Sequence, residues 1–129
     1  MSQRSLKHIP IYRKALNLCV MSREIASYVS FNKDLLRLYE SHSLRDIMAN
    51  SLLTDSILIP QKIAQTEFSN SNLERQKNVS FINIMIRNIN SYCLGLEKDG
   101  VKETEYLHLL REELNSFRKS YKKWKSSFR

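Results

Sequence analysis

Glycine and proline are scarce in this chain, with two of each among 129 residues. All-β folds and glycine-rich phosphate loops depend on many more of them, because both residue types shape tight turns. A chain of this length can bury the core of one domain, and a hydrophobic content of 42% excludes wholesale disorder. The composition therefore favours one domain, residues 1–129, built from long helices with short polar connections.

Cysteines and long hydrophobic runs are equally rare. Cys19 and Cys93 are too few for a disulfide scaffold and lack metal-ligand spacing, so we expect both to be buried and reduced. No stretch of about 18 apolar residues occurs, which excludes a membrane-spanning helix. Arg13 and Lys14 interrupt the apolar stretch nearest the N-terminus, which therefore does not resemble a signal peptide. We expect a cytoplasmic protein with no membrane partner.

The residue combinations of familiar catalytic sites are also missing. His8, His42 and His108 are scattered, and no Gly-x-Ser-x-Gly or Walker-type loop occurs. We therefore predict no catalytic residue, no metal and no cofactor, that is, a protein that is not an enzyme. Asp55 is unusual because it falls near the apolar face of a predicted helix. We expect it to pair with a basic group such as Arg87 in a structural role.

Apolar residues recur every three or four positions in four segments, as they do along one face of an α-helix. The clearest case runs from Leu107 to Phe128, where steps of three and four alternate without a gap. Short connections between four such helices predict an all-α fold, an antiparallel up-down-up-down four-helix bundle. The predicted helices span about residues 9–40, 43–68, 72–98 and 102–127.

Local signals support these bounds. Ser43 and residues 70–72 are candidate N-terminal caps, and Asp99-Gly100 ends the third helix. Pro60 lies inside the second helix, where it removes a backbone donor, but the apolar pattern continues beyond it, so we expect a kink rather than a break. Ser30 weakens the first helix near its middle, which leaves open an end near this residue and a second start at residue 33.

Basic residues exceed acidic ones, giving a formal net charge of +8. The predicted topology gathers residues 1–28, 60–80 and 116–129 at one end of the bundle. These stretches hold 14 basic and 3 acidic residues, whereas the rest of the chain holds 7 basic and 10 acidic ones. Cations near a helix C-terminus interact favourably with the helix dipole, but this does not explain the N-terminal cluster. The sorting predicts a charge dipole along the bundle and a polyanionic partner.

We predict that this end binds RNA or DNA through phosphate contacts. Tyr121 and Trp124 lie among its lysines and would stack on bases if exposed, but they continue the apolar stripe, and burial is the favoured interpretation. An acidic protein surface is the alternative partner. A membrane surface ranks last, because the apolar faces are committed to the core. The candidate nucleic-acid-binding residues are Arg4, Lys7, Arg13, Lys14, Lys62, Arg75, Lys77, Arg118, Lys119, Lys122, Lys123, Lys125 and Arg129.

Three stretches resemble a family of bacterial four-helix bundles. Ile11-Tyr-Arg-Lys-Ala-Leu-x-Leu resembles the opening helix of the proteins encoded in 23S rRNA intervening sequences. Ser56-Ile-Leu-Ile-Pro-Gln-Lys-Ile-Ala resembles their Ser-Ile-Pro-x-Asn-Ile-Ala motif, which also carries a proline. Glu105-Tyr-x-x-Leu-x-x-Glu resembles their closing helix, and Trp124-Lys-Ser resembles the ending of the related accessory variability determinant proteins of diversity-generating retroelements.

The resemblance implies a function as well as a fold. Accessory determinants form basic homopentamers that bind nucleic acid and assist a reverse transcriptase in copying template RNA, and the resemblance implies these partners here. The intervening-sequence proteins share the bundle, and a structural or protein-interaction module of that type is the alternative. Departures occur at Gln65-Thr66, where that family has Glu-Gly, and at Lys122-Lys123, where the determinants have two glycines. The basic bias favours the accessory determinants.

Overall fold

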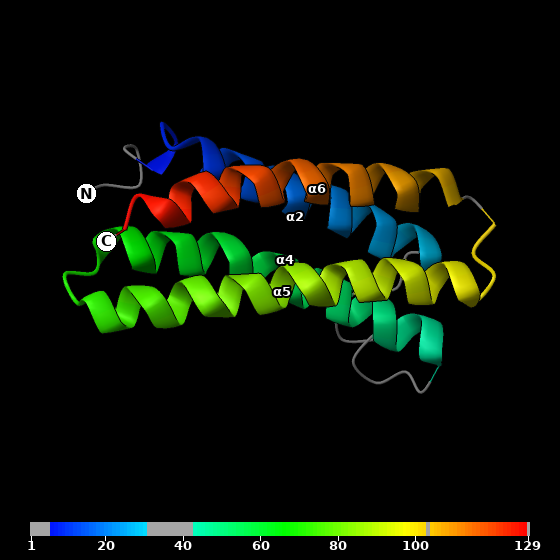
Figure 1. The fold of residues 1–129 in the computed structure, drawn as a ribbon. Helices are drawn as coiled ribbons and strands as arrows, with labels where there is room; N and C mark the ends of the chain where they lie inside the picture. The colour runs from blue at the N-terminus through cyan, green and yellow to red at the C-terminus, as the bar shows by residue number, and fades with distance from the viewer. Residues whose placement is uncertain (1–5, 31–42, 103, 129) are drawn as a thin grey trace.

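The computed structural model describes residues 6–30, 43–102 and 104–128, and four long helices account for most of them (Figure 1). The helices are α2 (Pro10–Val29), α4 (Leu44–Phe68), α5 (Asn72–Lys98) and α6 (Thr104–Ser126). Successive helices run in opposite directions, as Figure 1 shows. Contacts join α2 to α4, α4 to α5, α5 to α6, and α6 back to α2. The predicted all-α four-helix bundle is confirmed.

The helix bounds follow the local signals in the sequence. The predicted segments 43–68 and 72–98 match α4 and α5 to within one residue, and the connection between them is the predicted turn. The helix α2 ends at Val29 with Ser30 at its C-cap. This agrees with the alternative prediction in which the first helix ends near Ser30. The remainder of that prediction, residues 31–42, lies outside the described residues.

Caps at both ends of α5 show why it begins and ends where it does. The Ser71 hydroxyl accepts a hydrogen bond from the Glu74 backbone N–H at 3.2 Å, and Ser43 caps α4 in the same way. At the other end Gly100 has φ +88°, a left-handed conformation that glycine adopts without steric cost. The Val101 N–H then reaches back to the Leu96 carbonyl at 3.3 Å and closes the helix.

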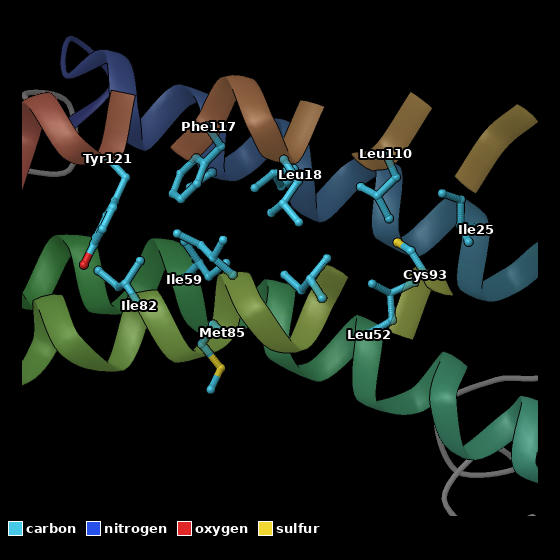
Figure 2. Close-up of a cluster of buried hydrophobic side chains, with 14 of the residues drawn as sticks. Leu18, Ile25, Leu52, Ile59, Ile82, Met85, Cys93, Leu110, Phe117 and Tyr121 are labelled. Carbon is cyan, nitrogen blue, oxygen red and sulfur yellow. The ribbon is translucent and has the colours of Figure 1, made fainter. Parts of the chain in front are cut away.

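One apolar face of each helix lines a shared core. Figure 2 shows Leu18 of α2, Ile59 of α4, Ile82 of α5 and Phe117 of α6 pointing into the interior between the helices. All four side chains are fully buried. Each such side chain stabilises the folded state by about 1.5–3 kcal/mol through its removal from water. Burial of these apolar faces is therefore the main contribution to the stability of the bundle. In the described ranges no helix has the length and apolar character that a membrane span requires.

The helix α4 runs unbroken through Pro60, and α2 supplies the hydrogen bond that this proline cannot make. Proline has no backbone N–H, so the Ser56 carbonyl four residues earlier lacks its helical donor. The Cys19 thiol donates to that oxygen with an S···O distance of 2.9 Å in the buried interior. Burial raises the pKa of the Cys19 thiol, which keeps the proton needed for this bond. The bond joins α2 to α4, and both cysteines are free and buried, as predicted.

This arrangement predicts a non-additive pair of substitutions. Cys19→Ala should lower the free energy of unfolding by about 1 kcal/mol beyond its loss of packing, because the Ser56 carbonyl loses its donor. Pro60→Ala restores a backbone N–H at the position that donates to Ser56, so the same cysteine substitution should cost less in that background. Urea unfolding of the wild type, the single variants and the double variant measures the coupling.

Cys93→Ala is the matched control, because Cys93 is also fully buried and its truncation removes the same atom. Its cost should not depend on Pro60→Ala. A cost of Cys19→Ala that is equal in both backgrounds would contradict the proposed replacement of the backbone donor.

Candidate nucleic-acid interface

The up-down topology brings three separate basic stretches to one end of the molecule. In Figure 1 the start of α2, the α4–α5 turn and the end of α6 all lie at this end. The described candidate residues there come from the start of α2 and the segment before it, the end of α4, the start of α5 and the end of α6; they are Lys7, Arg13, Lys14, Lys62, Arg75, Lys77, Arg118, Lys119, Lys122, Lys123 and Lys125. We call this set the basic end. Arg4 and Arg129 lie outside the described residues.

Two residues counted with this end in the sequence lie elsewhere. Glu24 lines a hollow of about 390 Å³ with Val101 and Leu109, next to the α5–α6 connection. Arg23, in the second half of α2, lines a separate hollow together with Ile57 from the middle part of α4. The count took the first helix to extend to residue 40, whereas α2 has 20 residues and reaches the opposite end by Val29. The correction removes one basic and one acidic residue from the count for the basic end and leaves the net charge of that end unchanged.

The acidic residues that stay at the basic end are engaged by neutral donors. The Trp124 indole N–H donates to Glu67 Oε1 at 2.7 Å, and the Ser69 hydroxyl donates to Glu74 Oε2 at 3.1 Å. The ion pairs between described residues lie at the other end, where Arg45 pairs with Asp99 at 2.8 Å and Glu97 with Arg111 at 3.8 Å. Both carboxylates keep their negative charge, but the described part of the basic end holds eleven cations against these two, so the net field there is strongly positive.

Several of these cations are held by neutral partners rather than by carboxylates. Lys14 Nζ donates to the Ser116 hydroxyl at 2.9 Å, which also ties α2 to α6. Lys62 Nζ lies 4.9 Å from the centre of the Phe81 ring. The neutral contacts position these side chains without cancelling the positive field of the basic end.

The two aromatic residues among the lysines belong to the core. Tyr121 is 4% exposed and its hydroxyl donates to the Val79 carbonyl at 2.7 Å, while Trp124 is 8% exposed. Burial also raises the pKa of the Tyr121 hydroxyl, which stays protonated as a donor. The predicted burial is confirmed, and neither ring offers a face for stacking on a base.

The helix α6 presents its cations on two sides. Lys119 and Lys123 are exposed and one helical turn apart, away from the core. Arg111 faces α5, because it pairs with Glu97. Arg118, Lys122 and Lys125 follow Arg111 on the same side of α6 at helical spacing. From residue 114 to 129 the sequence contains no acidic residue, so this side of α6 is uniformly basic.

Asp55 does not have the partner that the sequence suggested. Arg87 is exposed, and the Asp55 Oδ2 atom instead accepts from the Tyr92 hydroxyl at 3.0 Å and the Asn88 amide at 3.3 Å. Neutral donors from one face of α5 thus join α4 to α5. The helical spacing of Asn88 and Tyr92 was visible in the sequence, but the rotation of α5 toward Asp55 was not. The role is structural, as expected.

No site with catalytic or metal-binding chemistry emerges from the described residues. They contain no group of three or more His, Cys, Asp or Glu side chains that would hold a metal ion. Sequence reasoning passed over the Glu-x-x-His spacing of Glu105 and His108, but both side chains are exposed and His108 Nε2 lies 3.1 Å from Glu97. Burial raises the pKa of the Cys93 thiol to about 12, so it is inert as a nucleophile.

Comparisons with known proteins give no further guide. The chain matches none of the family models against which it was scanned, and neither the curated proteins nor the solved structures contain a match.

The Asp55–Tyr92 contact predicts a pH-dependent contribution to stability. Burial, and then the Asp55 charge, raise the pKa of Tyr92 above the ordinary value of 10.0. The contribution is therefore present below pH 10 and is lost as the pH rises through the higher folded-state pKa. Tyr92→Phe should lower the free energy of unfolding by about 1 kcal/mol at neutral pH.

Unfolding measured from pH 8 to 11 checks both parts of this prediction. The wild type should lose stability more steeply than Tyr92→Phe above pH 10, because the variant no longer titrates at this position. Tyr106→Phe is the control, because Tyr106 is 53% exposed. Parallel pH profiles for the wild type and Tyr92→Phe would contradict the assignment.

Proposed function

We propose that this protein binds nucleic acid through the basic end, by contacts to the phosphate backbone, and that it acts without catalysis of its own. The observation that carries the proposal is the assembly of cations from three separate segments of the chain at one end of the bundle. The nearby carboxylates of Glu67 and Glu74 are engaged by neutral donors. Polyanions are the partners that such a field attracts.

The side chains available at the basic end support recognition of charge rather than of base sequence. Lysine and arginine neutralise phosphates and release condensed counterions, so binding should weaken steeply as salt rises. Tyr121 and Trp124 are buried and unavailable for stacking. Base contacts would have to come from other residues, and phosphate contacts alone carry no sequence information.

The more specific role, as accessory protein to the reverse transcriptase of a diversity-generating retroelement, rests on the sequence resemblance alone. A reverse transcriptase gene and a repeated variable template beside this gene would support it. The alternative from the same resemblance is a structural or protein-interaction module of the rRNA intervening-sequence type, whose basic end docks on an acidic protein. Equal affinity for RNA, DNA and heparin would favour this alternative, because heparin offers charge without nucleic-acid geometry.

The proposal predicts that charge at the basic end controls RNA affinity. Lys119→Glu combined with Lys123→Glu should weaken binding by about tenfold or more at physiological salt and should flatten the dependence of log affinity on log salt. Fluorescence anisotropy with a labelled single-stranded RNA measures both quantities.

The matched control is Lys98→Glu combined with Lys102→Glu. It makes the same change in net charge on two exposed lysines near the α5–α6 connection, at the other end of the molecule. We expect it to reduce affinity far less. Equal losses for the two double variants would show that net charge alone matters, and binding that is insensitive to salt would contradict the proposal altogether.

The resemblance also leads us to propose a ring of five copies, which would bring five basic ends to one face and strengthen binding through multivalency. Light scattering coupled to size exclusion should then give a mass five times the chain mass of 15.3 kDa. A mass equal to that of a single chain across the concentration range would contradict the ring and leave the basic end unaffected.

A further inference from the structure

A pocket lies where the first turns of α5 meet the C-terminal end of α6. It has a volume of about 290 Å³ and is lined by Arg75, Gln76, Val79, Ser80, Lys125 and Phe128. Two of these residues are cationic, two carry neutral hydrogen-bonding groups, and none is acidic. Liquid water takes about 30 Å³ per molecule, so the pocket has room for a tetrahedral anion and part of the group that bears it.

The Arg75 side chain is held in this pocket by an aromatic stack. Its guanidinium carbon lies 5.2 Å from the centre of the Phe128 ring. Phe128 meets Trp124 edge to face, with ring centres 5.0 Å apart at 89°, and Trp124 is anchored by its hydrogen bond to Glu67. These three successive contacts restrict the Arg75 side chain, which would otherwise sample many rotamers.

Arg75 also has unused hydrogen-bonding capacity. Its Nε atom is buried and has no hydrogen-bond partner among the residues that the structure describes. A buried donor without an acceptor is unfavourable, and a guanidinium fork matches the paired oxygens of a phosphate. Lys125, on the α6 side of the pocket, adds a second positive charge.

We propose that this pocket binds a single phosphate group of a nucleic-acid backbone. Arg75 contacts it through the planar guanidinium, Lys125 neutralises it, and the Ser80 hydroxyl and Gln76 amide complete the ring of donors. The inference rests on the proposed function and makes it more specific. The pocket fixes one phosphate in position, while exposed cations such as Lys119 and Lys123 attract the polymer without fixing its register.

The test replaces the planar guanidinium of Arg75 by the ammonium group of lysine, which keeps the positive charge but not the geometry. Arg75→Lys should weaken binding of a labelled single-stranded oligouridylate by about tenfold, because the fork and its stack on Phe128 are lost. Arg111→Lys is the matched control, since Arg111 is half-buried on α6, pairs with Glu97 away from the basic end and does not line the pocket; it should change affinity less than about twofold. Phe128→Leu keeps the charge and an apolar side chain but removes the ring on which Arg75 stacks, and it should weaken binding as Arg75→Lys does.

A second measurement uses Trp124, the single tryptophan of the chain. Because Trp124 touches Phe128 at its edge, RNA binding should change the Trp124 fluorescence in the wild type and in Arg111→Lys, and should leave it unchanged in Arg75→Lys. Circular dichroism and urea unfolding of each variant verify that the fold is intact.

The outcomes separate the pocket from the proposed function. A wild type that fails to bind the RNA overturns the proposed function and, with it, the pocket. Equal affinities of Arg75→Lys and Arg111→Lys for the RNA overturn the pocket alone. Inorganic phosphate that changes Trp124 fluorescence without displacing the RNA would assign the pocket to a free anion and overturn its place in nucleic-acid binding.

Discussion

The burial of one apolar face from each of four helices is the constraint on which the rest of the structure depends. The faces are removed from water only when neighbouring helices lie side by side, and the three-residue connection between Phe68 and Asn72 allows α4 and α5 to do so only in opposite directions. Once this direction is set, the start of α2, the α4–α5 turn and the end of α6 meet at one end. Charges that are far apart in the sequence therefore share one surface, although the apolar faces, and not these charges, set the arrangement of the helices.

The same constraint assigns opposite roles to neighbouring residues on α6. Tyr121 and Trp124 complete the buried seam, and each places its polar atom on a partner, the Val79 carbonyl and the Glu67 carboxylate. The lysines between them point away from the seam because they occupy the other helical positions. Core formation thus has an electrostatic consequence, since the buried Trp124 fixes the position of the Glu67 carboxylate while the lysines beside it on α6 are left at the surface.

Local signals made much of the fold predictable, whereas contacts between helices were not. The bounds of α5 follow from Ser71 and Gly100, whose effects reach only a few residues along the chain. The bond from Cys19 to the Ser56 carbonyl, and that from Tyr92 to Asp55, depend on how far each helix is shifted and rotated against its neighbour. Periodicity identifies the buried face but leaves that shift open. The wrong position predicted for Glu24 has the same cause. The length assumed for the first helix determined where along the bundle axis Glu24 was placed.

The candidate site shows the same division between charge and geometry. A count along the sequence treats every lysine and arginine at the basic end as equivalent. For the long-range attraction of a polyanion these residues are indeed equivalent, because that attraction depends on their charges and distances. The packing of Phe128 against Trp124 makes Arg75 different, because it sets the orientation of a planar group beside a pocket. That orientation needs three side chains at once, from α5, from α6 and from the residues that follow α6, so no single segment of sequence encodes it. Attraction to a polyanion is thus a property of the composition, and the position at which a phosphate would be held is a property of the fold.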